Sequence, residues 1–472
     1  MASFSTIPEL DVELLKKYDR AGPRYTSYPT APAFHEGFQS EDFRQALTGN
    51  KPLPFGGTNR NLSLYFHIPF CDTLCYFCGC NMIVSNNRSR INHYLQYLIR
   101  EIGLNRSHIA DNRKLEQLHW GGGTPTHLNP EEIRTLGKAI ASNYDFADDF
   151  EASCEIDPRE LTREHLEALH ESGFNRISLG LQDLNPQVQK AVNRIQSLEL
   201  TAGIVKQARE LGFKSINIDL IYGLPRQTPG SFAATLEQVL EMDPDRIALF
   251  NFAYLPKMFK HHKVIISEEM PGPADKLEIL VRSVQRICTR GYRFIGMDHF
   301  AKEGDELALA QDRGDLYRNF QGYSTRKGLD VVAHGITGIS QVGRTYSQNL
   351  KTEKEYFEAL DAGRLPTLKG YELTEDDLIR RHVITEIMCH FHLEFRKFEE
   401  LTGHRFKDYF APELASSGPD SLASMEKDGL VRRNPESLEI LPMGRFLIRN
   451  IAMCFDAHLK RSVGAAGYSR TI

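Results

Sequence analysis

The most informative segment of this chain is Ile68-Pro-Phe-Cys-Asp-Thr-Leu-Cys-Tyr-Phe-Cys-Gly-Cys-Asn81. Within ten residues it holds four of the eight cysteines, Cys71, Cys75, Cys78 and Cys80, whereas the other four are scattered. The first three follow a C-x3-C-x2-C spacing, which forms a compact cup of soft ligands. Such a cup suits a zinc ion or an iron–sulfur cluster, and the rest of the sequence must decide between them.

The composition indicates the setting in which this cup works. The chain has 472 residues with 57 Lys+Arg against 62 Asp+Glu, a net charge of −5, which gives no general attraction to nucleic acid or to an anionic membrane. The opening residues lack the basic and apolar regions of a secretory signal. No apolar run approaches the roughly 18 residues of a membrane span. We therefore expect a cytoplasmic protein, whose clustered thiols bind metal rather than form disulfides.

Alternating strand and helix patterns predict the fold class. Six segments rich in β-branched, aromatic and Leu residues are each followed by a stretch with helical periodicity. The segments are Leu62–Ile68, Leu115–Trp120, Phe150–Ile156, Arg176–Leu181, Ser215–Tyr222 and Arg246–Ala253. The helical stretches are Ile91–Leu104, Glu131–Asn143, Arg163–Ser172, Leu200–Leu211, Ser231–Glu241 and Asp275–Arg290. This α/β pattern predicts an open (β/α)6 partial TIM barrel with right-handed crossovers, because six units are too few to close an eight-stranded barrel.

Unusual polar or glycine residues follow each predicted strand. They are the cysteines, Gly121–Pro125, Glu155 and Asp157, Gln182 and Asp183, Asp219 and Gly223, and Asn251. Ligands of parallel α/β proteins bind outside the carboxyl ends of the strands, so these groups are expected to converge on one cavity. The alternative is that strand ends are polar only because they are loops.

The chain divides into three expected parts. Residues 1–58 form an extended N-terminal arm or lid, in which Gly22–Thr30 is too rich in proline for a helix. Residues 59–365 form the catalytic barrel, and residues 366–472 form a smaller, mainly helical domain with a possible two-strand wing. A last helix is expected over Gly444–Leu459. This C-terminal domain offers an intramolecular partner for exposed barrel surface, which favours a monomer.

The spacing of the cysteines bears on the metal. A tetrahedral zinc site usually draws its ligands from two separated pairs, whereas these cysteines share one short loop. Three thiolates would leave one iron of a cubane cluster free to bind a small ligand. Tyr76 and Phe77 could supply a flat face for an adenine ring, and Gly121–Gly123 could let a ligand approach the backbone closely.

The motif, in this place after the first strand, resembles that of the radical S-adenosylmethionine (SAM) enzymes. The chain as a whole resembles one branch of them, the oxygen-independent coproporphyrinogen III oxidases, also called coproporphyrinogen dehydrogenases. The resembling segments span nearly the whole chain: Gly22–Pro29, Tyr65–Asn81, His119–Thr126, Glu155–Arg159, Asn217–Gln227, Phe294–Ala301, Asn319–Tyr323 and Arg449–Asp456.

The resemblance implies a set of cofactor-binding residues. Cys71, Cys75 and Cys78 would bind a 4Fe–4S cluster, and two molecules of SAM would bind beside it. Positions that match the first SAM site are Tyr65, Gly122, Glu155 and Ile339. Positions that match the second are Phe77, Gly123, Thr124, Gln182, Arg194, Asp219 and Ala253.

The resemblance also implies a reaction. A low-potential donor would reduce the cluster, and a 5′-deoxyadenosyl radical would then take hydrogen from a propionate side chain of coproporphyrinogen III. Two propionates would become vinyl groups, giving protoporphyrinogen IX in anaerobic haem biosynthesis. Tyr65, Cys80 and Gln321 are the candidate catalytic residues, and Arg24, Arg159 and Arg176 are candidates to bind the substrate carboxylates.

Two other functions compete with this enzyme. The related haem chaperones share the barrel but lack the fourth cysteine and the arm, so Cys80 and residues 1–58 argue against a chaperone. A zinc-bound structural or nucleic-acid module is disfavoured by the one-loop spacing and by the absence of a basic composition.

Overall fold

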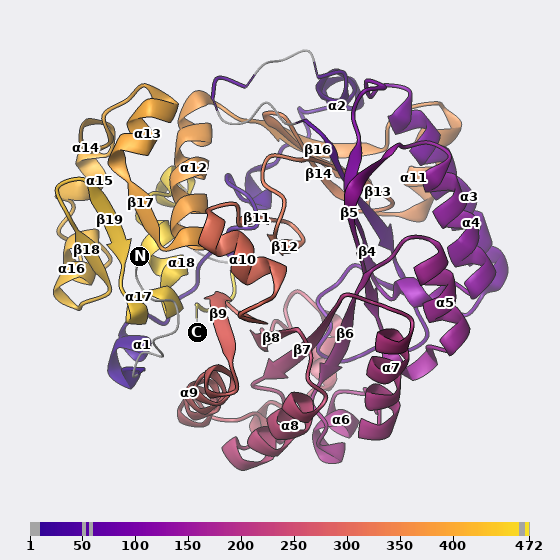
Figure 1. The fold of residues 1–472 in the computed structure, drawn as a ribbon, viewed down its shortest axis with the longest axis horizontal. Coiled ribbons are helices and arrows are strands. Elements are labelled where there is room, and N and C mark those ends of the chain that lie inside the picture. The colour runs from indigo at the N-terminus through magenta and orange to yellow at the C-terminus, as the bar shows by residue number, and fades with distance from the viewer. Residues whose placement is uncertain (1–9, 50–52, 56–59, 462–467, 472) are drawn as a thin grey trace.

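The computed structural model describes residues 10–49, 53–55, 60–461 and 468–471. Its centre is a 12-stranded sheet with the order β16-β15-β14-β13-β1-β4-β5-β6-β7-β8-β10-β9 (Figure 1). The parallel strands are β1 (Leu62–Ile68), β4 (Leu115–Gly122), β5 (Phe146–Ile156), β6 (Arg176–Gln182), β7 (Ser215–Tyr222) and β8 (Arg246–Asn251). All six predicted strands are therefore confirmed in the predicted order, and the sheet does not close on itself.

A further parallel strand, β13 (Asp330–His334), pairs with β1 and was not predicted. It is short and is followed by strands rather than by a helix. Antiparallel strands extend the sheet beyond it: β14 (Ile339–Val342), β15 (Thr345–Asn349) and β16 (Thr367–Glu372). At the opposite edge, β10 (His299–Lys302) pairs with β8 and with β9 (Tyr292–Gly296).

Helices surround the parallel strands on their outer side (Figure 1). They are α3 (Arg88–Arg106), α4 (Pro130–Ala141), α5 (Arg163–Glu171), α6 (Pro186–Ala191), α7 (Leu198–Glu210), α8 (Pro229–Glu241) and α9 (Pro273–Thr289). In α4, Asn129 and Glu132 form a capping box at the N-terminus, and Ile133, Leu136 and Ile140 recur on one buried face. The amphipathic periodicity thus explains why these segments pack on the sheet. Among the described residues, we find no helix with the length and hydropathy needed to cross a bilayer.

The N-terminal arm is not wholly extended, because it contains α1 (Val12–Tyr18) and α2 (Ser40–Leu47). Between them, Gly22–Thr30 is not helical, as predicted. This segment is fixed to distant parts of the chain: Tyr28 is buried, and the Arg449 guanidinium donates to the Pro23 carbonyl at 2.9 Å. Residues 1–9 and the expected boundary at 58 lie outside the described residues.

The C-terminal part is mainly helical, as predicted. It contains α12 (Glu375–His390), α13 (Phe395–Thr402), α14 (Phe406–Tyr409), α15 (Ala411–Ala415), α16 (Leu422–Lys427), α17 (Pro442–Phe446), α18 (Ile448–Met453) and α19 (Ala457–Arg461). The expected wing is β18 (Val431–Arg433) with β19 (Ser437–Ile440), joined by β17 (His392–Glu394).

The single last helix expected over Gly444–Leu459 is wrong. Leu447, with φ −105° and ψ 23°, separates α17 from α18. Asp456 starts α19 by accepting the N–H groups of His458 and Leu459 at 2.8 and 2.9 Å. Side-chain capping of this kind competes with continuation of a preceding helix.

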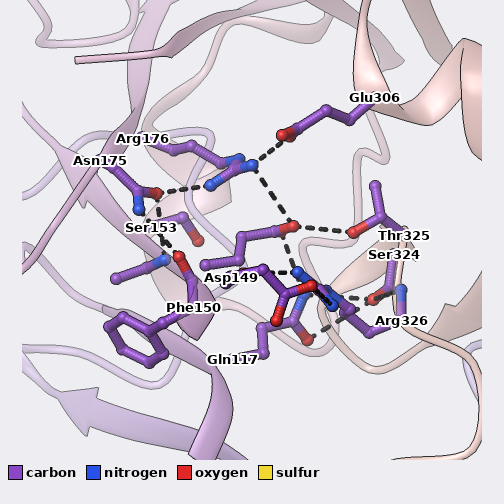
Figure 2. A network of polar contacts seen from close by, with 12 residues as sticks. Gln117, Asp149, Phe150, Ser153, Asn175, Arg176, Glu306, Ser324, Thr325 and Arg326 are labelled. Carbon is purple, nitrogen blue, oxygen red and sulfur yellow. Dashed lines mark hydrogen bonds and ion pairs between the residues drawn. The ribbon is translucent and has the colours of Figure 1, made fainter. Parts of the chain in front are cut away.

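A polar network at the amino ends of the strands fixes the loop after β12 (Gly322–Ser324) against β5, as Figure 2 shows. Glu151 accepts from Gln117 Nε2 at 3.1 Å and from Thr325 Oγ1 at 2.7 Å, and Arg176 lies between Glu151 and Glu306. Burial opposes ionisation of Glu151, but the charges of Arg176 and Arg246 and the hydrogen bonds from Thr325 and Gln117 together outweigh it, so the pKa of this carboxyl is lowered. The expectation that Arg176 binds substrate carboxylates is therefore wrong: it is the first residue of β6, at the end of the strand away from the cysteines.

Candidate cofactor and substrate site

A cavity of about 290 Å³ lies at the carboxyl ends of β4 to β7, beside the cysteine loop. The predicted residues that line it are Cys71, Cys75, Phe77, Cys78, Cys80, Gly122, Gly123, Thr124, Glu155, Asp157, Arg159, Gln182, Arg194 and Asp219. These residues come from six separate segments of the chain. Groups that follow five of the six predicted strands therefore converge on one cavity, as the strand-end pattern indicated, whereas Asp183, Gly223 and Asn251 do not line it.

Backbone contacts hold the cysteine loop in place. The short strands β2 (Phe70–Cys71) and β3 (Ile83–Val84) pair at its two ends. Between them, the Tyr76 N–H donates to the Val192 carbonyl at 3.0 Å, and Asn193 Nδ2 donates to the Leu74 carbonyl at 2.8 Å. The segment after α6 therefore fixes the middle of the loop.

Each of the three predicted ligand sulfurs has a hydrogen-bonding neighbour. Cys71 Sγ lies 3.4 Å from Thr124 Oγ1, and Cys78 Sγ accepts the Cys80 N–H at 3.4 Å. Cys75 Sγ lies 3.5 Å from both Arg159 Nη2 and Arg194 Nη1. All described cysteines are free of disulfides. Three thiols on one cavity wall, each beside such a group, fit an iron–sulfur cluster held by thiolates.

The glycines after β4 are required by contacts within the protein. A Cβ on Gly123 would lie 2.6 Å from the Pro69 carbonyl carbon and 2.8 Å from the Phe70 oxygen. Gly122 has φ +122°, and a Cβ there would meet the His67 ring at 2.9 Å. These two glycines therefore let β4 approach the start of the cysteine loop, whatever ligand lies above them.

Glu155, at the end of β5, presents an acceptor to the cavity with a side chain that is 47% exposed. It accepts the Gly122 N–H at 3.3 Å and lies 3.4 Å from His119 Nε2. Burial opposes its ionisation, but the His119 and Gly122 hydrogen bonds more than offset this and the pKa of Glu155 lies below its usual range. The His119 ring in turn stacks on Tyr65 at 5.8 Å. Tyr65 thus reaches the site through His119.

Arg194 contacts a carboxylate of the protein itself. Its Nη1 lies 2.9 Å from Asp157 Oδ2, and Arg159 Nη2 lies 2.6 Å from the same oxygen. Burial opposes ionisation of Asp157, but Arg194 and Arg159 lower the pKa of this carboxyl below its usual range. Arg159, expected to bind substrate, is thus already paired, and Asp157 offsets one of the two positive charges beside Cys75.

Asp219 forms the opposite wall of the cavity. It accepts Asn217 Nδ2 at 2.7 Å and Ser178 Oγ at 3.2 Å, and burial raises the pKa of Asp219 to about 6. The neighbouring Gln182 has φ +70° at a register shift between β6 and β7, and its Oε1 has no hydrogen-bond partner among the described residues. An unpaired acceptor at a strained backbone position is typical of a ligand-binding residue.

Four predicted site residues lie outside the wall of this cavity. Tyr65 contacts it through His119, and Gln321 lies in the turn between β11 (Tyr317–Asn319) and β12. Ala253 follows β8, and Ile339 begins β14, where it packs near Phe34 and Tyr346. The structure therefore does not bring these four into the cavity that holds the other predicted residues.

Some lining residues were missed by the sequence reasoning. They are Thr73, Met82, Ile156, Ser178, Gly180 and Phe250. The two-residue period of a strand could have identified some of them: Ser178 and Gly180 share one face of β6 with Gln182. Gly180 also pairs in register with Asp219.

The comparisons with known proteins agree with this geometry. The family model described as the Radical SAM superfamily matches residues 65–239. Oxygen-independent coproporphyrinogen III oxidases from Escherichia coli and Pseudomonas aeruginosa are 46% and 45% identical to this chain, over 98% of it and 98% of their own lengths. A solved structure of coproporphyrinogen III oxidase from Escherichia coli, described as a radical SAM enzyme, is similar with a TM-score of 0.89 at 45% identity, covering 96% of this chain and 100% of that one.

Full-length identity at this level, with a shared fold and the cysteine cup at the expected strand end, leaves one family. The chain belongs to the oxygen-independent coproporphyrinogen III oxidases of the radical SAM superfamily.

Proposed function

We propose that this protein oxidatively decarboxylates two propionate side chains of coproporphyrinogen III to vinyl groups and so produces protoporphyrinogen IX. The observation that carries the proposal is the convergence of three cysteines and eight of the eleven candidate SAM-binding residues on one cavity, in a chain similar over its full length to enzymes of that name. A haem-binding chaperone on the same fold is not favoured, because the full-length relatives carry the name of the oxidase.

Family membership brings a 4Fe–4S cluster and SAM as cofactors. Cys71, Cys75 and Cys78 would hold the cluster, and Cys80 is not a ligand in this proposal. When bound, these cofactors supply the electron and the radical that removes hydrogen from a propionate. Glu155 is proposed to hold one SAM molecule and Asp219 a second.

The residues of the chain bind the cofactors and the substrate and orient them. A carboxylate such as Glu155, fixed by two hydrogen-bond donors, offers a rigid acceptor for the amino or hydroxyl groups of SAM. Asp157 holds Arg194 against the Gly180 carbonyl, to which Arg194 Nε donates at 3.1 Å. Gln321 and Cys80 are proposed to act on the substrate side. The remaining predicted contacts to SAM are those of Tyr65, Gly122, Ile339, Phe77, Gly123, Thr124, Gln182 and Ala253.

Several further expectations stay proposals. Residues 1–58 would serve as an arm that helps to close the cavity, residues 59–365 as the catalytic part and residues 366–472 as a C-terminal domain. A low-potential electron donor would act as partner. A monomeric state and a cytoplasmic location complete the proposal.

One assay tests the function. The anaerobically reconstituted protein is incubated with coproporphyrinogen III, SAM and a reductant, and vinyl products are followed by chromatography. Formation of protoporphyrinogen IX with consumption of SAM is expected. Stable binding of a porphyrin without either change would contradict the proposal and favour a binding protein.

A further inference from the structure

Three arginines approach one another where the N-terminal arm, β11 and α18 meet. Arg318 Nε donates to the Arg24 carbonyl at 3.4 Å, and Arg449 Nε donates to the adjacent Pro23 carbonyl at 2.9 Å. Arg318 is 7% exposed and Arg449 is equally buried, whereas the Arg24 side chain keeps 34% of its surface exposed. Arg318 and Arg449 thus lie inside the protein, and Arg24 is partly exposed to solvent.

Their positive charge is not balanced by the surrounding protein. Asp298, which contacts Arg24, is the one carboxylate in ion-pair contact with any of the three among the described residues. Arg449 donates to the Pro23 and Arg470 carbonyls, which are neutral. Burial and repulsion from the other two arginines lower the pKa of Arg24 to about 9, and burial with repulsion from Arg318 lowers that of Arg449 to about 10. Buried excess charge of this kind is costly unless an anion joins it.

Unsatisfied donors accompany this charge. Arg318 Nη1 is buried and has no hydrogen-bond partner among the described residues, and the same holds for Gln321 Nε2. Both residues belong to the hairpin of β11 and β12. Buried donors are almost always paired in folded proteins, so two unpaired donors on one hairpin indicate a missing acceptor.

Aromatic rings connect the arginines to the cofactor cavity. The Arg24 guanidinium lies over the Phe250 ring at 5.6 Å, and Phe250 lines the cavity. The His299 ring contacts Phe250 at 5.8 Å and Tyr323 at 5.5 Å, both edge to face. The Arg318 guanidinium lies over Tyr323 at 4.8 Å. The arginines therefore form the far side of a wall whose near side faces the cysteines.

We propose that Arg24 and Arg318 form a carboxylate subsite that holds a propionate of the tetrapyrrole substrate while another propionate lies at the cofactor end. The proposal rests on the proposed function and names residues for its substrate. A guanidinium can donate two parallel hydrogen bonds to one carboxylate. An arginine therefore suits an anionic side chain better than a lysine does. Arg449 is a positioning residue, because its donors are used by the arm.

The test compares two ligands on the holoenzyme by equilibrium dialysis: coproporphyrin III, which carries four carboxylates, and its tetramethyl ester, which carries none. Arg318→Gln and Arg24→Gln are expected to weaken binding of the tetra-acid roughly 10- to 100-fold, as truncation of a hydrogen-bonded charge pair does. Binding of the ester is expected to change less than about twofold, and Arg318→Lys to retain part of the affinity for the acid. KM for coproporphyrinogen III should rise in parallel, with cluster content and SAM affinity unchanged.

A matched control is Arg282→Gln, which removes an exposed arginine whose one ion-pair partner among the described residues is Glu278 on the same helix. Unchanged affinity of the two variants for the tetra-acid, or equal losses for acid and ester, would overturn the subsite, because a structural role affects both ligands alike. Failure of the proposed function has a different signature: the wild-type holoenzyme would form no vinyl product, whatever the arginine variants bind.

Discussion

Replacing Gly123 with alanine should detach the cysteine loop from the sheet. A Cβ at this position would lie 2.6 Å from the Pro69 carbonyl carbon and 2.8 Å from the Phe70 oxygen, whereas ordinary contact begins at 3.4 Å. Two backbone segments must therefore separate by about 0.8 Å. The obstacle is backbone on both sides, so rotation of a side chain cannot relieve it.

The cost follows from the bonds that join these segments. The Gly123 N–H donates to the Ile68 carbonyl at 2.9 Å, and the Thr124 N–H donates to the Phe70 carbonyl at 2.8 Å. Overpacking costs about 1–3 kcal/mol, and each buried backbone hydrogen bond left unmade adds about 1–3 kcal/mol. We expect a local penalty of about 3–5 kcal/mol, concentrated between β1 and Cys71. That is enough to move Cys71 relative to the other two ligand cysteines.

Two measurements separate loss of the site from loss of the fold. Iron and sulfide content after anaerobic reconstitution should fall several-fold in Gly123→Ala, while far-ultraviolet circular dichroism keeps its helical signal. The matched control is Gly203→Ala inside α7, where an added Cβ meets nothing within 4 Å and should stabilise the helix by about 0.5–1 kcal/mol. A Gly123→Ala protein with wild-type cluster content and wild-type melting temperature would refute the reasoning from close approach.

Four other substitutions test separate parts of the site and fold. Cys75→Ser should abolish the cluster absorbance and Cys80→Ser should keep it; the opposite pattern in metal analysis would contradict the ligand assignment. His119→Phe should keep cluster content but weaken SAM binding about tenfold, because Glu155 loses a donor to its charged form, and unchanged affinity in calorimetry would disprove the link. Burial raises the pKa of Glu101 to about 7 from 4.5, so the folded state holds the proton more tightly and the free energy of unfolding should fall by about 3 kcal/mol as pH rises through that interval. Glu101→Gln should remove this slope from denaturant titrations, and a slope that persists would rule out Glu101 as its origin.

Strand positions were predictable from sequence because the parallel strands are buried. Ser215–Tyr222 alternates buried and half-buried residues and was predicted to the residue. The strand β13 was not predicted, because its five residues precede a tight antiparallel turn rather than a helix. The broken last helix could not be predicted either: no proline marks the break, and Asp456, which caps α19, also accepts a hydrogen bond from Tyr25 of the distant arm at 2.9 Å.

The candidate site was predictable from the sequence only where a polar or charged residue lies at the carboxyl end of a strand. Glu155 and Asp219 occupy the carboxyl ends of β5 and β7, so the rule for parallel sheets places them in the cavity. The same rule excludes Arg176, which begins β6 and so lies at the opposite end of the strand from the cavity. Arg318 was not among the predicted site residues, because its proposed role depends on a hairpin far along the chain and on packing against the arm. No local sequence pattern records either feature.

The charges on the two sides of Phe250 would orient the proposed substrate. Beside the cysteines, the three carboxyl groups of Asp157, Glu155 and Asp219 outnumber the two arginines, Arg159 and Arg194, which suits a cationic sulfonium ligand. Beyond Phe250 the balance reverses, because three arginines share one carboxylate. A tetrapyrrole with four carboxylates would be repelled from the first end and attracted to the second. The propionate that reacts must therefore be brought to the acidic end by the hold on another propionate, which explains how a chain of net charge −5 could bind so anionic a substrate in one orientation.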